Sequence, residues 1–282
     1  MGQGGDTFQT RRDWYETWFR SRRLMLELAM TRVRWACGLI FAMAVSGASV
    51  PAAEWGSIEG QFVADGKIEV PVVFKKGDVT VKDGAVCAVA DMPDETLVVN
   101  PANNGVANVF IFLRKAPADI HPGAKAVPTE KLTFDQAGCR YLPHGMVVRV
   151  GQPVNCISSD GASHNVHTNP VANSAENFIV QPNDKVGKSL TFKLVDSLPV
   201  KVTCDIHPWM SSYWLATDHP YAAITDADGK FKIENLPAGE HTFRVWHERQ
   251  GYLNREYKVQ VAAGKTTTLA VEKVPATKLA KK

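Results

Sequence analysis

Short runs of alternating apolar and polar residues recur along the chain, and most of them end at Gly, Pro, Asn or Asp. Residues 56–63 (GSIEGQFV) alternate, and residues 107–113 (ANVFIFL) form the continuous apolar run of a buried strand. Within residues 54–282 no stretch keeps the 3.6-residue period of an amphipathic helix over many turns. The pattern predicts an all-β protein of the sandwich type. Further strand-like runs lie at 145–157, 189–195, 221–225, 230–236, 240–246, 255–261 and 266–272.

An export signal is predicted over residues 1–53. Arg32 and Arg34 precede an apolar run (WACGLIFAMAV) and a tail of small residues (SGASVPAA), which is the order of a signal sequence. The apolar run is too short for a comfortable membrane span. After cleavage the chain is therefore expected in the periplasm or cell envelope, with no stable membrane span. Two alternatives stay open, namely a true start at Met30 and twin-arginine export through SRRLML in place of general secretion.

The charge distribution argues against a nucleic-acid partner. Of the 282 residues, residues 1–34 hold seven Arg and four Asp or Glu, which accounts for the whole net charge of +3. From Trp35 onward there are 25 basic and 25 acidic residues. A nucleic-acid-binding protein normally shows a basic excess or stripe in its folded part, and none is visible here.

One seven-residue stretch, CDIHPWM, places Cys204, His207 and Met210 close together. Thiolate, imidazole and thioether groups are all ligands that copper accepts. Forty residues earlier, the stretch SDGASHNVHTNP adds His164 in a predicted loop. The competing interpretation is a buried core cysteine, a surface histidine and a packing methionine that lie together by chance.

The two stretches together resemble the cupredoxin family of blue copper proteins, of the plastocyanin and amicyanin type. The preceding YLPHGMVVRVGQPV is similar to the strand and hairpin of that family, so the resemblance covers residues 128–217. It implies a Greek-key β-sandwich holding one copper ion, which cycles between Cu(I) and Cu(II). His164, Cys204 and His207 would be equatorial ligands and Met210 the axial one.

The same resemblance implies roles for the neighbours of these residues. Asn165 would join the two ligand loops by hydrogen bonding. His167 is the rival of His164, but in an extended chain the two side chains face opposite sides, so both cannot reach the metal. His207 would reach the surface in an apolar patch rimmed by Trp209, where unidentified redox partner proteins would dock.

A second resemblance concerns the rest of the chain. The stretch TDADGKFKIENLPAGEHTFRVW is similar to the carboxypeptidase-regulatory or transthyretin-like sandwich, and the opening strand pattern of that sandwich lies far upstream, at Gly56 to Gly66. This implies a smaller, discontinuous sandwich from residues 54–127 and 218–273, with the cupredoxin domain inserted. Residues 274–282 are expected to be a disordered tail.

Four cysteines remain after signal cleavage, and an oxidising compartment favours their pairing. If a metal occupies Cys204, at most one bridge can form. Cys156 lies in a strand-like run and is interpreted as a small buried apolar residue. The preferred disulfide is therefore Cys87 with Cys139.

The leading hypothesis is an exported one-electron carrier. The alternative is a binding or structural module of the cell envelope whose copper is stored, carried or stabilising. An enzyme is not expected, because no Ser-His-Asp, H-E-x-x-H or phosphate-loop pattern occurs.

Overall fold

The computed structural model describes residues 54–280, so the predicted export signal lies outside the described residues. The described chain consists almost wholly of β-strands, with three short helices. The predicted all-β class is therefore confirmed. Among residues 54–280, no helix is long and apolar enough to span a membrane.

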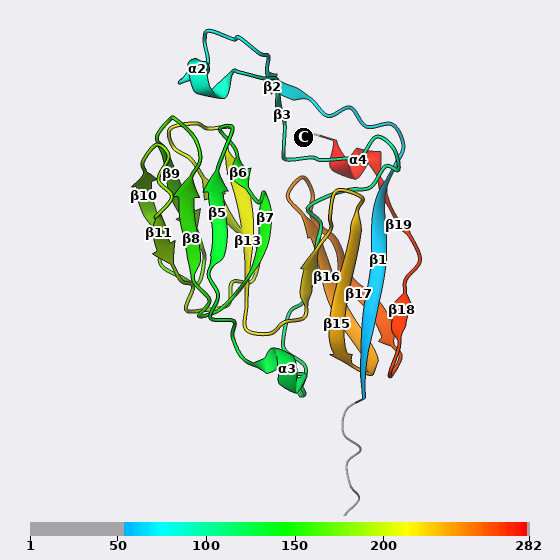
Figure 1. The fold of residues 1–282 in the computed structure, drawn as a ribbon. Helices are drawn as coiled ribbons and strands as arrows, with labels where there is room; N and C mark the ends of the chain where they lie inside the picture. The colour runs from blue at the N-terminus through cyan, green and yellow to red at the C-terminus, as the bar shows by residue number, and fades with distance from the viewer. Residues whose placement is uncertain (1–53, 281–282) are drawn as a thin grey trace, which may run out of the picture. The chain divides into compact units, whose positions relative to one another are not determined.

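Two sheets combine the beginning of the described chain with its end (Figure 1). One has the order β15-β1-β18, with β19 also paired to β1, and the other has the order β14-β4-β16-β17. Strand β1 pairs antiparallel with β15, so that Ile58 lies opposite Ile233 although 175 positions separate them. Alternate residues of these strands point into one apolar core that includes Ile58, Leu236 and Phe243. The strands are β1 (Trp55–Asp65), β4 (Phe110–Leu113), β14 (Ala222–Ile224), β15 (Lys230–Pro237), β16 (Gly239–His247), β17 (Gly251–Val261), β18 (Thr266–Thr268) and β19 (Glu272–Pro275).

The Asp-Gly turn before β15 packs directly on β1. Gly229 has a φ of 73°, and a Cβ atom there would lie 2.1 Å from the carbonyl oxygen of Phe62. Only glycine fits both the left-handed backbone and this close approach. The glycine of the D-x-D-G turn is therefore fixed by its contact with β1, while Asp226 and Ala227 of the same turn stay exposed.

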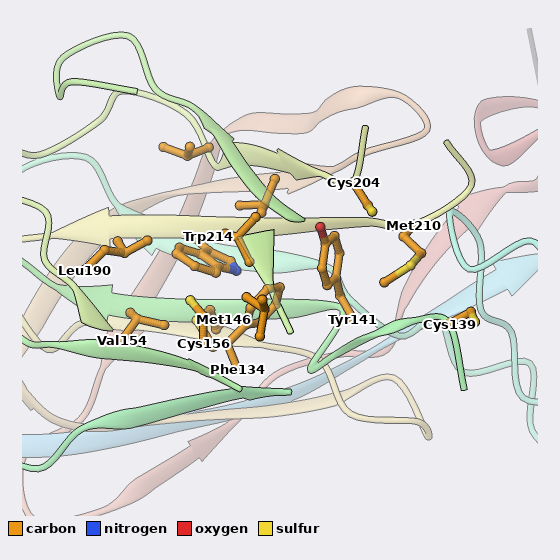
Figure 2. Close-up of a cluster of buried hydrophobic side chains, with 14 of the residues drawn as sticks. Phe134, Cys139, Tyr141, Met146, Val154, Cys156, Leu190, Cys204, Met210 and Trp214 are labelled. Carbon is orange, nitrogen blue, oxygen red and sulfur yellow. The ribbon is translucent and has the colours of Figure 1, made fainter. Parts of the chain in front are cut away.

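The middle of the chain forms two further sheets, of orders β10-β9-β12-β13-β7 and β11-β8-β5-β6. Their facing sides enclose a core in which Trp214 lies edge-on to Phe134, with 4.7 Å between the ring centroids (Figure 2). The strands are β5 (Leu132–Gln136), β6 (Tyr141–Leu142), β7 (Gly145–Arg149), β8 (Val154–Ser158), β9 (His164–Asn169), β10 (Asn177–Val180), β11 (Lys188–Leu190), β12 (Val200–Thr203) and β13 (Ser211–Thr217). The division of the chain into a nested and a surrounding domain stays a prediction.

Residues 67–95 lie between β1 and β4 and hold only short elements: β2 (Val72–Phe74), α2 (Gly84–Cys87) and β3 (Met92–Pro93). We call residues 67–95 the cover segment. A further short helix, α3 (Pro122–Lys125), precedes β5. Both helices have a single turn and lie in connections.

The expected disordered tail is wrong for the residues that the structure describes. Strand β19 pairs in parallel with β1, with Phe62 opposite Glu272, and helix α4 (Ala276–Leu279) follows it. Val274 and Leu279 are 5% and 0% exposed and belong to the sandwich core. The burial of these two apolar side chains offsets the entropy of ordering a lysine-rich end.

Candidate metal centre

Three of the four predicted ligands lie on the connection between β12 and β13. The backbone closes this connection on itself, because Cys204 N–H donates to the Met210 carbonyl at 3.3 Å and Met210 N–H donates to the His207 carbonyl at 2.9 Å. His164 is the first residue of β9, which pairs antiparallel with β12. The sheet register thus carries His164 to the same end of the sandwich as the loop.

The structure brings together His164, Cys204 and His207, whose donor atoms lie within 4.8 Å of one another. The Nδ1 atoms of the two histidines are 2.9 Å apart, and the Cys204 Sγ lies 3.9 Å from His207 Nδ1. All three side chains are buried, at 0%, 2% and 0% exposure. Met210 is 1% exposed and belongs to the same apolar cluster, and Figure 2 draws it at the end of the cluster that also holds Cys204.

Each imidazole is held from behind by a carboxylate. His164 Nε2 lies 2.8 Å from Asp160 Oδ2, and His207 Nε2 lies 3.0 Å from Asp83 Oδ2. An ionised carboxylate only accepts hydrogen bonds, so each Nε2 carries the proton. Each Nδ1 then faces the other ring and the sulfur, where it can bind a proton or a metal ion. Carboxylates bonded to the far nitrogen are the usual support of metal-binding histidines.

This donor set fits a cation. Two imidazole lone pairs 2.9 Å apart repel each other unless a shared proton or a positive ion lies between them. A buried thiol at the same point adds a soft ligand. A second group, formed by Cys139, Asp160 and His164, is also close enough to hold an ion. It does not fit, because the sulfur of Cys139 is already bonded in a disulfide.

The electrostatics of the site favour a thiolate. Burial raises the pKa of Cys204, and hydrogen bonds from His164 and His207 lower it. The lowering is the larger effect in sum, so the pKa of Cys204 is about 6. Burial lowers the pKa of His164, whereas its hydrogen bonds to Asp160 and Cys204 raise it, and the net pKa is about 9. Near neutral pH the metal-free site therefore holds a thiolate beside an imidazolium, and a metal would replace the extra proton.

Asn165 joins the two ligand-bearing segments, as predicted. Its Oδ1 accepts from the backbone N–H of Asp205 at 2.7 Å, and its Nδ2 donates to the Asp205 carboxylate at 3.0 Å. His167 points away from the centre, because it lies on the opposite face of β9. Its side chain is 33% exposed and its Nδ1 lies 3.0 Å from Asp205 Oδ1. Of the two rival histidines, His164 thus lies in the buried group and His167 lies outside it.

The expectation that His207 reaches the surface is wrong. Its ring is 0% exposed, and Asp83 of the cover segment occupies the place next to its Nε2. Trp209 is half-buried, donates its indole N–H to the carbonyl of Cys139 at 3.1 Å, and contacts Phe74 edge-on at 5.0 Å. A docking patch centred on His207 and Trp209 is therefore not retained.

The disulfide prediction is confirmed. Cys87 and Cys139 are bonded, with Cα atoms 5.2 Å apart, and Cys156 and Cys204 are free and buried. Sequence reasoning missed both supporting carboxylates. Asp160 carried a weak signal, since it precedes His164 by four positions, but Asp83 lies 124 positions from His207.

Comparisons with known proteins each match only part of the chain. Residues 214–272 match the family model of the carboxypeptidase regulatory-like domain. No curated protein sequence matches the chain. Among solved structures, the chain is similar to an oxidised mutant of amicyanin, at 23% identity over 36% of this chain and 90% of that chain, with a TM-score of 0.27.

Two further solved structures are similar at the same level. One is a purple cupredoxin from Nitrosopumilus maritimus, at 17% identity over 30% of this chain and 99% of that chain, with a TM-score of 0.26. The other is a copper-containing nitrite reductase from Thermus scotoductus, at 22% identity over 36% of this chain and 27% of that chain, with a TM-score of 0.26. The chain is thus similar to a carboxypeptidase regulatory-like domain over residues 214–272 and, over part of its length, to solved cupredoxins.

Proposed function

We propose that this chain is an exported mononuclear copper protein that carries single electrons between redox partner proteins. His164, Cys204 and His207 are the principal ligands, and Met210 is a weaker axial ligand. The observation that carries the proposal is the buried convergence of two imidazole Nδ1 atoms and one sulfur within 4.8 Å.

The ligand types favour copper over zinc. Structural zinc sites are completed by further thiolates, imidazoles or carboxylates, whereas here the fourth side chain at the loop is the thioether of Met210. Two imidazoles, one thiolate and a weak thioether form the set that supports one-electron copper chemistry with little change in geometry. Asp160 and Asp83 orient the rings, and the burial of all four ligands excludes water.

The closed surroundings favour electron transfer over delivery of the metal. Handing an ion to another protein requires a ligand that the recipient can reach and replace. His164, His207 and Met210 are at most 1% exposed and Cys204 is 2% exposed. An electron can leave such a site through the protein, whereas a metal ion cannot leave without opening it. Localisation in the periplasm or cell envelope is part of the proposal and rests on the sequence of residues 1–53.

A second candidate is a binding or structural module of the cell envelope, in which copper only stabilises the fold. The match of residues 214–272 to the carboxypeptidase regulatory-like domain favours it. Under this candidate the metal would bind but would not cycle between oxidation states at a useful rate. The two candidates therefore differ in redox behaviour and agree on metal binding.

Redox cycling of the copper-loaded protein tests the proposal. We expect an intense visible absorption from the Cys204 thiolate–Cu(II) bond, which disappears on reduction and returns on reoxidation. His164→Ala should abolish this band, and the matched His167→Ala should leave it unchanged. A loaded protein that is colourless as Cu(II), or one that bleaches irreversibly, would refute the electron-carrier proposal.

A further inference from the structure

The cover segment packs on the same apolar cluster that encloses the metal ligands. Phe74, Cys87 and Met92 are buried, at 8%, 3% and 4% exposure, in the cluster that includes Cys204 and Met210. Of the described strands, β2 and β3 pair only with each other and join neither sheet of the middle of the chain. The segment is therefore an addition to the sandwich that lies over its ligand-bearing end.

Several independent contacts hold the cover segment in place. The disulfide joins Cys87 to Cys139, which precedes β6. Further along, the Asp94 carboxylate accepts from Arg249 at 3.0 Å, where both side chains are less than 10% exposed. A buried ion pair is costly to break by removal of one partner. These contacts fix the segment at the last residue of α2 and at its C-terminal end, so it is a built part of the molecule. A partly exposed ion pair between Glu95 and Arg140, at 3.1 Å, adds to them.

Asp83 is turned toward the metal centre rather than toward its own helix. It stands at the N-cap of α2, where an aspartate usually accepts a hydrogen bond from the first turn, but its side chain makes no such bond. Its backbone has a φ of 54°, a left-handed conformation that is uncommon for residues other than glycine. Its carboxylate instead lies 3.0 Å from His207 Nε2. The contact with His207 thus replaces the local capping bond.

We propose that the cover segment is a built-in closure of the His207 face of the centre and that Asp83 is the positioning residue through which it acts. The inference rests on the proposed function. Asp83 holds the Nε2–H of His207, so that Nδ1 faces His164 and Cys204 before any metal arrives. With this hydrogen bond and the packed segment in place, neither water nor a chelator reaches His207. The closure therefore slows the loss of the bound ion.

Removal of the Asp83 carboxylate should open this face. Outer carboxylates on metal-binding histidines typically change metal affinity by about 10- to 100-fold. We expect copper transfer from Asp83→Ala to the Cu(I) chelator bathocuproine disulfonate to be faster than from the unmodified protein by about this factor. Asp83→Asn should fall between them, because its amide oxygen still accepts a hydrogen bond but carries no charge.

Asp91→Asn is the matched control. Asp91 lies on the same segment, and its carboxylate bonds only to Lys75 and to the backbone N–H of Lys76. Its substitution changes the same charge and should leave copper transfer unchanged. A rate for Asp83→Ala within twofold of the unmodified protein would overturn the proposal, as would an equal acceleration by Asp91→Asn.

A measurement on the metal-free protein keeps this inference separate from the proposed function. The ring Nε2–H of His207 should exchange slowly with solvent in nitrogen-15 NMR spectra, and at least tenfold faster in Asp83→Ala, in line with the loss of one charge-assisted hydrogen bond. If the unmodified protein binds no copper, the proposed function fails. The exchange rate of the His207 Nε2–H then tests by itself whether Asp83 closes this face. Equal exchange in both proteins would overturn the closure.

Discussion

The disulfide between Cys87 and Cys139 should contribute a large part of the stability of the cover segment and of the sandwich below it. The bond closes a loop between residues separated by 52 positions. In the chain-entropy account, a loop of this length stabilises the folded state by about 4 kcal/mol at room temperature. Replacing both cysteines by alanine should therefore lower the free energy of unfolding by about this amount, within the usual range of 2–5 kcal/mol.

Urea unfolding of the metal-free protein measures this effect. Tryptophan fluorescence reports on Trp214 and Trp209, which lie in and beside the same core, together with Trp55 and Trp246 of the other sheets. Circular dichroism recorded in parallel shows whether the two probes give coincident transitions, as a two-state analysis requires. The matched control is Cys156→Ala, which removes a buried, unpaired sulfur from strand β8 and should cost only about 1 kcal/mol.

The result can refute the reasoning in one clear way. If the double alanine variant loses no more stability than Cys156→Ala, the bond does not constrain the unfolded chain as proposed. Equal loss would mean that the cover segment is held by its other contacts, such as the ion pair of Asp94 with Arg249. A slope of unfolding free energy against urea that rises in the variant would support a less compact unfolded chain.

Three further predictions concern single positions. Met210→Leu should retain copper but shift the reduction potential measured by voltammetry, because the axial bond is weak; loss of all copper would contradict the axial role. In metal-free Cys156→Ala protein, ultraviolet absorption should show the Cys204 thiolate forming near pH 6. The free energy of unfolding contributed by this thiolate should be lost as pH falls through 6, and the contribution of protonated His164 should be lost as pH rises through 9. A thiol transition near the ordinary pKa of 9.0 would exclude the ion pair. Leu279→Ala should lower the unfolding free energy by about 2–5 kcal/mol, and a change below about 0.5 kcal/mol would contradict its burial.

Features that depend on residues close together in the sequence could be predicted. The alternation in residues 56–63 and 230–236 reflects one buried face per strand, and the structure places these runs in β1 and β15. The spacing of Cys204, His207 and Met210 is contained in one short loop, so sequence alone could propose a shared site. The opposite directions of His164 and His167 follow from the two-residue repeat of an extended chain.

Long-range contacts between short, aperiodic segments could not be predicted. The cover segment has no sustained period, and its contact between Asp83 and His207 spans 124 positions. The contact of His207 with Asp83 therefore depends on a segment that holds only two short strands and one helical turn. The order of the C-terminal end could not be predicted for a related reason, since its two buried apolar side chains, Val274 and Leu279, lie among lysines.

The position of copper in crystals of the loaded protein tests the central claim most directly. Anomalous scattering recorded at the copper absorption edge should show one strong site, bounded by His164 Nδ1, His207 Nδ1 and the sulfur of Cys204, with Met210 as the remaining neighbour. Copper found instead at the surface pair of His167 and Asp205, or spread over several weak positions with none among the buried ligands, would contradict the account.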